Sequence, residues 1–90
     1  MRYINFSDHL EKIIAESLEI ANIEFIHESE NKEQLLDFYL PKYGTYIEVK
    51  QFHADRISRQ MATQDNVIAI QGKNAVSLIS AMIKMLKFLT

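Results

Sequence analysis

The chain has 90 residues, 48% of them hydrophobic, and a formal net charge of −2 at pH 7. This length supports one small domain with a single core, residues 1–90, and the absence of cysteine excludes disulfides and a thiolate zinc site. The apolar stretches are well under the roughly 20 residues of a membrane-spanning helix. No signal sequence is recognisable, so we expect a cytoplasmic protein that does not bind membranes.

The charge is divided unevenly along the chain. Residues 1–40 carry three basic and nine acidic side chains, a net charge of −6, whereas residues 41–90 carry seven basic and three acidic ones, a net charge of +4. A molecule polarised in this way can offer a basic face to a phosphate backbone although its total charge is negative. The total charge argues only against strong non-specific binding to nucleic acid.

The first element in the chain is predicted to be a helix. Ser7 can cap its first turn, and Asn22 is the expected stop because asparagine tolerates the left-handed backbone that ends helices. The residues between them that share one helical face are mostly apolar: Leu10, Ile13, Ile14, Ser17, Leu18 and Ala21. This face is expected to cover a sheet.

Four short strands and two more helices are predicted after the first helix. The strands are indicated at residues 23–27, 35–40, 45–52 and 67–70. A turn at residues 41–44 joins the middle two as a hairpin, and Gly72 marks the turn into the last helix. The two helices are expected at residues 54–63 and 73–89. The predicted fold class is α/β, with the order α-β-β-β-α-β-α and a mixed sheet flanked by helices.

The last predicted helix is apolar except for a narrow stripe: Ser77, Ser80, Lys84 and Lys87. A helix of this kind is usually buried on more than one side. One face can cover the sheet, and the remaining apolar side chains either complete the core or form a surface for self-association. They are Met82, Met85, Leu86 and Leu89. We favour self-association because a small domain has little interior to spare.

Charged side chains interrupt the two strands of the predicted hairpin. Asp37 lies in the first strand, and Glu48 and Lys50 lie in the second. Because side chains alternate between the faces of a strand, Glu48 and Lys50 point to the same face, and Asp37 can join them there. A pair of carboxylates binds a hard divalent cation, and a nearby lysine can orient a water molecule. The set therefore suits metal-assisted hydrolysis of a phosphodiester.

These residues and the element order resemble the PD-(D/E)XK nuclease superfamily, whose minimal core is the restriction-endonuclease-like fold. Asp37 matches the acid of the second core strand, Glu48-Val49-Lys50 matches the E-x-K of the third, and Glu11 matches a glutamate on the first helix. Leu36 stands where the family name has proline, and Gln51 where many members have glycine. Neither departure removes a functional group.

The pattern is most similar to the phage endonuclease I type of Holliday-junction-resolving enzyme. The matching stretches are Leu10-Glu11-Lys12, Leu18-Glu19, Ile23-Glu24-Phe25 and Asp37-Phe38-Tyr39-Leu40-Pro41. The chain lacks the added elements with which relatives grip DNA, so the resemblance implies that specificity comes from a homo-oligomer or a partner.

The resemblance implies a magnesium-dependent endodeoxyribonuclease, with manganese as a substitute ion. The expected metal ligands are Asp37, Glu48, the main-chain carbonyl of Val49, and Glu11. Lys50 is expected to orient the attacking water. Basic or amide side chains that could contact DNA are Arg56, Arg59, Gln60 and Lys73. The three histidines, His9, His27 and His53, show no ligand spacing. His53, three residues past Lys50, could reach the site, although a lone surface histidine is the commoner case.

Plainer explanations exist for each of these residues. Asp37 could be a paired structural carboxylate, Glu48 and Lys50 could form an ordinary surface ion pair, and Glu16 competes with Glu11 for the helix position. Two other functions also remain open. One is a nuclease-fold accessory subunit that binds DNA or protein without cutting, and the other is a small interaction protein that docks through its apolar last helix.

Overall fold

The computed structural model describes residue 6 and residues 8–50 and 66–89. Its elements are α1 (His9–Ile20), β1 (Ile26–His27), the short 3-10 helix η1 (Glu28–Glu30), β2 (Phe38–Leu40), β3 (Thr45–Lys50), β4 (Val67–Gln71), α3 (Lys73–Met85) and the 3-10 helix η2 (Leu86–Phe88). The predicted α/β class is confirmed. The helix predicted at residues 54–63 lies outside the described residues.

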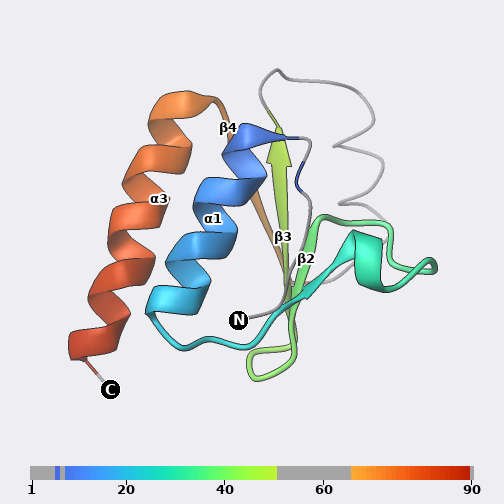
Figure 1. Ribbon diagram of the computed structural model, residues 1–90, viewed down its shortest axis with the longest axis horizontal. Helices are drawn as coiled ribbons and strands as arrows, with labels where there is room; N and C mark the ends of the chain where they lie inside the picture. The colour runs from blue at the N-terminus through green and yellow to red at the C-terminus, as the bar shows by residue number, and fades with distance from the viewer. Residues whose placement is uncertain (1–5, 7, 51–65, 90) are drawn as a thin grey trace.

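The four strands form one mixed sheet in the order β1-β2-β3-β4. The strands β1, β2 and β3 are successively antiparallel, and β4 runs parallel to β3 (Figure 1). The predicted hairpin between β2 and β3 is present, and Gly44 closes its turn with a positive φ of 59°. Strands β1 and β2 are shorter than predicted. Because β2 starts at the end of the sheet where β3 finishes, Asp37 and Lys50 lie at the same end.

The first helix begins and ends through side-chain and backbone caps. The Asp8 carboxylate accepts a hydrogen bond from the Leu10 N–H at 2.8 Å, so Asp8 is the N-cap, and Ser7 lies outside the described residues. At the other end, Asn22 has a φ of 59°, and the Ile23 N–H donates to the Leu18 carbonyl at 2.9 Å. These contacts form a Schellman motif. The predicted stop at Asn22 is therefore confirmed.

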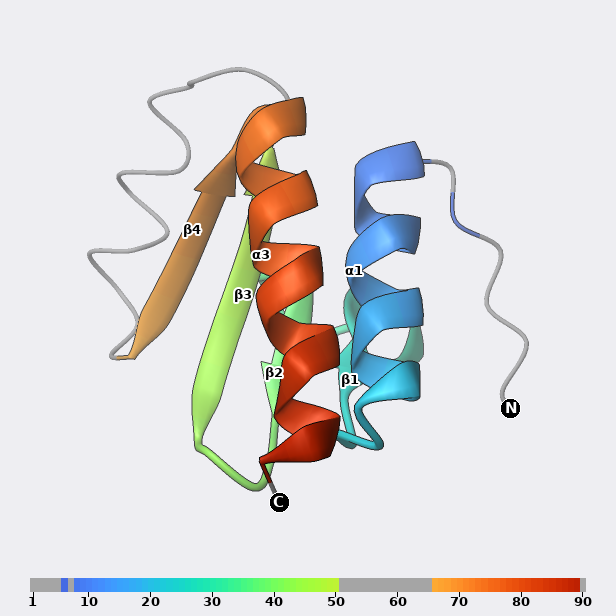
Figure 2. The same cartoon turned by 90° about the vertical axis from the view of Figure 1, so that its left-hand side faces the viewer.

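Both described helices pack on one face of the sheet, side by side (Figure 2). Their apolar faces meet the strand residues Phe38, Ile47, Val49 and Ile70 in a single core. On β3, Glu48 and Lys50 alternate with these core residues and point to the opposite face of the sheet. Between the helices, the buried hydroxyls of Ser17 and Ser80 share a hydrogen bond. Ser80, a member of the predicted polar stripe, is thus buried in the interface between the helices.

Of the four surplus apolar residues of the last helix, only Leu86 packs against the core. Met82, Met85 and Leu89 expose 53%, 61% and 75% of their surface, and only Leu86 is half-buried. The interpretation that all of them complete the core is therefore wrong. None of the helices in the described ranges has the length and apolar content to cross a membrane.

Candidate active site

Asp37 and Glu48 face each other across the hairpin at the end where β2 begins. The registered pairs are Phe38 with Ile47 and Tyr39 with Tyr46. Extending this register by one residue places Asp37 opposite Glu48, and residues directly opposite in a sheet point to the same face. The sequence alternation that grouped Asp37, Glu48 and Lys50 is thus realised in the pairing of the strands.

A hydrogen bond to the backbone of β3 fixes the Asp37 carboxylate. The Val49 N–H donates to Asp37 Oδ2 at 2.7 Å, in the place where a further β2 residue would otherwise pair. On a strand, the N–H and C=O of one residue lie at the same edge. The next carbonyl, of Lys50, points to the other edge, where it accepts from the Gly72 N–H at 2.8 Å. The Val49 carbonyl therefore projects toward the Asp37 side, as a metal ligand there requires.

The Glu48 carboxylate is buried with few donors. Glu48 is 1% exposed, and Lys50 Nζ lies 3.0 Å from its Oε1. Among the described residues, neither oxygen of this carboxylate has a hydrogen-bond partner in suitable geometry, so the lysine acts on it as a nearby charge. A buried carboxylate without donors is costly unless a cation compensates it. The ammonium, and the proton of Asp37 when it is present, are the groups that compensate Glu48.

Burial beside Glu48 also changes the pKa of Asp37, which is 2% exposed. Burial, followed by the adjacent Glu48 carboxyl group, raises the pKa of Asp37 to about 7, and the Val49 N–H and the Lys50 ammonium oppose the rise. Without a metal ion, Asp37 therefore keeps its proton to about pH 7. A divalent cation would replace that proton.

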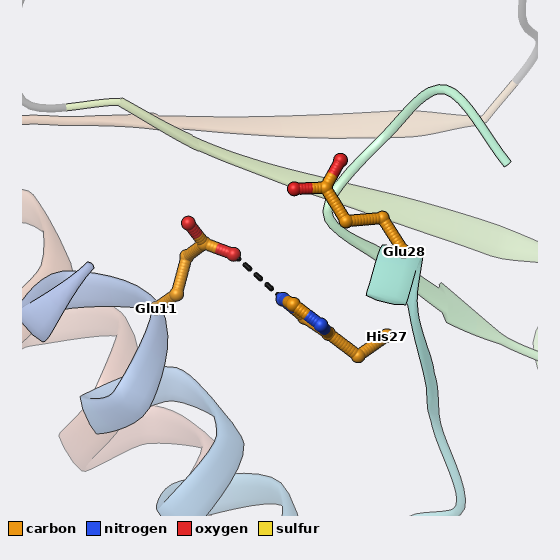
Figure 3. Close-up of side chains that lie close together, drawn as sticks. All are labelled: Glu11, His27 and Glu28. Atoms are coloured by element: carbon orange, nitrogen blue, oxygen red, sulfur yellow. Dashed lines mark hydrogen bonds and ion pairs between the residues drawn. The ribbon is translucent and has the colours of Figure 1, made fainter. Parts of the chain in front are cut away.

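Glu11 and His27 form a second part of the site, on the helix side. Glu11 lies in the first turn of α1, and His27 ends β1. His27 Nε2 lies 2.7 Å from Glu11 Oε1 (Figure 3). The imidazole is 5% exposed and packs against the rings of Phe6 and Phe38, at centroid distances of 4.8 and 5.2 Å. The ring is thus held where it orients the Glu11 carboxylate.

The other ring nitrogen shows which form of His27 is present. The Ser29 N–H donates to Nδ1 at 3.2 Å, so Nδ1 acts as an acceptor and Nε2 carries the proton that is donated to Glu11. Burial also lowers the pKa of His27, which favours the neutral ring. In the other tautomer, Nδ1–H donates a hydrogen bond to the Ser29 hydroxyl, 2.8 Å away, and leaves Nε2 free as a metal ligand.

Glu28 completes a group that fits a cation. One potential ligand atom from each of Glu11, His27 and Glu28 lies within 4.8 Å of the others (Figure 3). The Glu28 N–H donates to the Asp37 carbonyl at 3.0 Å, which ties this group to the start of β2. Burial, with the negative charges of Asp37, Asp8 and Glu28, raises the pKa of Glu11 to about 8. Two carboxylates with an imidazole suit manganese better than magnesium.

These shifted groups predict how the stability of the metal-free protein depends on pH. In the unfolded chain Asp37 loses its proton near pH 3.8, whereas in the folded state it keeps the proton to about pH 7. The folded state therefore binds more protons in that window, and Asp37 makes stability fall as pH rises through it. We expect Asp37→Asn, with EDTA present, to melt at the same temperature as wild type near pH 4 and at least about 5 °C higher at pH 8.

The comparison with Asp37→Asn is needed because His27 acts in the opposite direction. Its lowered pKa makes the folded state bind fewer protons than the unfolded chain below pH 6.5, so its contribution to stability grows as pH rises. The difference between wild type and variant, measured by thermal denaturation from pH 4 to 8, reports the contribution of Asp37 together with its influence on Glu11 and His27. A difference that stays constant over this range would contradict the prediction.

The structure brings Asp37, Glu48, Lys50 and Glu11 to one end of the molecule. Their electrostatic coupling reflects this arrangement, since Asp37 and Lys50 both affect the pKa of Glu11. Glu16, the competing helix position, is exposed and belongs to no part of the group. The chemical roles of Asp37, Glu48, Lys50 and Glu11 stay predictions.

The predicted DNA-contacting residues are only partly described. Lys73, exposed at the start of α3, follows Gly72, whose N–H bonds to the Lys50 carbonyl, so it lies at the same end of the sheet. The other three predicted contacts lie outside the described residues: Arg56, Arg59 and Gln60.

Sequence reasoning missed His27 and Glu28. The search for metal-ligand spacing along the chain could not find them, because the distance between His27 and Glu11 is set by how α1 packs on the sheet. A usable signal was a histidine followed by an acid at the end of β1, whose neighbour β2 begins directly after Asp37. Comparison with known proteins identifies no relative, since no family model, curated protein or solved structure matches the chain.

Proposed function

We propose that the protein is a metal-dependent endodeoxyribonuclease with a PD-(D/E)XK type of site. The observation that carries the proposal is the juxtaposition of two nearly fully buried carboxyl groups, Asp37 and Glu48, beside one ammonium, while neither oxygen of Glu48 has a hydrogen-bond partner among the described residues. A structural ion pair would need one carboxylate for one lysine. Once Asp37 has lost its proton, two carboxylates face one lysine, and a divalent cation would neutralise the excess negative charge.

The donor set fits magnesium or manganese. Asp37, Glu48 and the Val49 carbonyl would provide three hard oxygen ligands, and Glu11 would provide a fourth from α1. A cation bound there would polarise a phosphate oxygen and assist the formation of a nucleophile from water. His27 and Glu28 lie close enough to Glu11 to bind a second ion or to fix the first through Glu11.

The protein's own groups then perform the positioning. The Lys50 side chain, 28% exposed beside Glu48, can hold a water molecule for in-line attack on phosphorus. Its ammonium can also donate a hydrogen bond to the phosphate oxygen that gains negative charge in the transition state. The Val49 N–H keeps Asp37 in place, and the His27 ring does the same for Glu11. Charge segregation supports a nucleic-acid substrate, because Lys73 lies at the site's end of the sheet and residues 41–90 are net basic.

A panel of labelled DNA substrates tests this function. We expect cleavage of at least one of linear duplex, nicked, branched and single-stranded DNA in 10 mM Mg²⁺ or Mn²⁺, and none in EDTA. Glu48→Gln keeps the size of the side chain and removes its charge, so it should lose cleavage at least about 10²-fold. Metal and DNA binding without cleavage on any substrate would instead identify the accessory subunit. Cleavage by Glu48→Gln at the wild-type rate would overturn the proposed site.

A further inference from the structure

Three side chains from three different elements meet on the helix side of the site. Glu11 belongs to the first turn of α1, His27 ends β1, and Glu28 begins η1 (Figure 3). One potential ligand atom of each lies within 4.8 Å of the other two. Asp37 and Glu48 are not members, and the described part of the chain contains no second set of three carboxylate or histidine ligands at this spacing. We call these three residues the His27 group, because they form a ligand set of their own.

A polar cavity leads to the His27 group. It has a volume of about 410 Å³, and its lining includes all three members together with Ser29 and Lys32. The His27 ring itself is only 5% exposed, and its Nε2 edge faces Glu11. An ion held by three protein ligands needs water for its remaining positions and a path from solvent. The cavity supplies both, so an ion can reach the buried imidazole.

The His27 group differs from the hairpin acids in its chemistry, because it includes a nitrogen ligand. Magnesium prefers oxygen ligands, whereas imidazole favours zinc and the other later first-row divalent ions. Zinc binds histidine nitrogen and carboxylate oxygen at about 2.0–2.2 Å, so neighbouring ligands on a tetrahedral ion are roughly 3.4 Å apart. Small rotations of the two glutamate side chains would bring the three atoms to this spacing. The group therefore suits zinc in the number and the type of its ligands.

The charges of the group also favour a cation. Across residues 8–50 and 66–89, no lysine or arginine forms an ion pair with Glu11 or Glu28. Glu11 is paired instead with His27, at 2.7 Å, and its side chain is 13% exposed. Lys32 lines the cavity, but it is exposed and makes no ion pair with either acid. A cation between the two carboxylates would offset the cost of holding them close together.

We propose that Glu11, His27 and Glu28 bind a zinc-type divalent ion at a site separate from the pair of Asp37 and Glu48. The ion takes the place of the hydrogen between His27 Nε2 and Glu11 Oε1. Nε2 loses that proton to solvent, and Nδ1 takes one up and donates a hydrogen bond to the Ser29 hydroxyl, 2.8 Å away. The Ser29 N–H gives up its 3.2 Å bond to Nδ1.

The proposed ion links the first helix to the edge of the sheet. Strand β1 has two residues and pairs with β2 alone, so packing and two backbone pairs hold it in place. An ion shared by Glu11 of α1 and His27 of β1 would tie these elements together. The second oxygen of Glu11 remains for the ion proposed at the hairpin. The zinc site does not depend on DNA cleavage.

Calorimetric titration of the whole chain with ZnCl₂, at pH 7.5 with excess Mg²⁺ present, tests the proposal. Magnesium competes for sites made only of oxygen and has little affinity for imidazole. We expect one zinc ion per chain with a micromolar dissociation constant. His27→Ala and Glu28→Gln should each raise this constant at least about tenfold, because each removes one of three ligands. Glu28 is half-buried, so its variant stays informative if the loss of the buried ring unfolds the chain.

Two control variants locate the ion. His9→Ala removes an exposed histidine of the same helix, α1, and should bind zinc like wild type. Asp37→Asn should keep the dissociation constant to within about fivefold, because Asp37 acts on this ion only as a charge outside its ligand sphere. Loss of binding in either control, with binding retained in Glu28→Gln, would overturn the proposal. So would the absence of binding up to about 1 mM zinc.

Nitrogen NMR of the histidine rings provides a readout that needs no variant. Without zinc, the His27 ring should carry its proton on Nε2. Zinc should convert it to the form with the proton on Nδ1 and should shift the Nε2 signal, whereas the His9 ring should keep its signals. Zinc binding that leaves the His27 ring unchanged would overturn the proposal. Because neither measurement involves DNA, a failed cleavage assay would leave the result standing.

Discussion

Replacement of Lys50 by Ala should reduce kcat for DNA cleavage by about 10³-fold in saturating Mg²⁺. The ammonium lies 3.0 Å from Glu48 Oε1 and is the one cation described beside the buried acids. A positioned donor that stabilises charge in the transition state contributes roughly 10²–10³ in rate, and orientation of the attacking water adds to this. Single-turnover cleavage of the best substrate in the panel measures the effect without interference from product release.

Controls separate catalysis from stability in this experiment. Removal of Lys50 leaves the buried Glu48 without its ion-pair partner, so Lys50→Ala should melt at a lower temperature in EDTA. Saturating Mg²⁺ should restore much of the loss, and the assay is therefore run at a temperature where circular dichroism shows a folded variant. Lys42→Ala, at an exposed lysine of the hairpin turn, should cleave like wild type. If Lys50→Ala, folded, retained wild-type kcat, the role assigned to the lysine would be wrong.

The sequence predicted the site on the hairpin because its geometry is local. Twelve positions separate Asp37 from the Val49 N–H that binds it, and a tight turn with strict alternation determines which side chains meet. The caps of α1 were partly predictable for the same reason. Asn22 was recognised as the stop, whereas the N-cap is Asp8, one residue later than expected. Both residues act within one turn of the helix.

Non-local packing explains what the sequence did not show. The contact between His27 and Glu11 depends on the position of α1 over the end of β1, and no spacing rule along the chain contains that position. The same holds for Ser80, a member of the predicted polar stripe. Its hydroxyl shares a hydrogen bond with that of Ser17, 63 positions earlier in the chain. Hydrophobic periodicity shows that a face is buried, and it does not say which neighbour covers it.

The binding of metal to Asp37 is expected to be visible as thermal stabilisation, independently of any substrate. A ligand at ten times its dissociation constant stabilises the folded state by about 1.4 kcal/mol, which corresponds to roughly 5–10 °C in a domain of this size. We therefore expect Mg²⁺ or Mn²⁺ to raise the melting temperature of the wild type at pH 7.5 by this amount. Asp37→Asn removes one charged ligand and should abolish the shift, although its melting temperature in EDTA is higher than that of wild type.

Two variants on α1 show whether the ion reaches the helix. Glu11→Gln should reduce the stabilisation because Glu11 is coupled electrostatically to Asp37 and oriented by His27. Glu16→Gln, an exposed position on the same helix, should leave it unchanged. A response of wild type and Asp37→Asn to the same extent would mean that the ion binds elsewhere. If the metal ion no longer raised the melting temperature of Asp37→Asn but still raised that of Glu11→Gln, the ion would bind at the hairpin alone. Glu11 and His27 would then not be among its ligands.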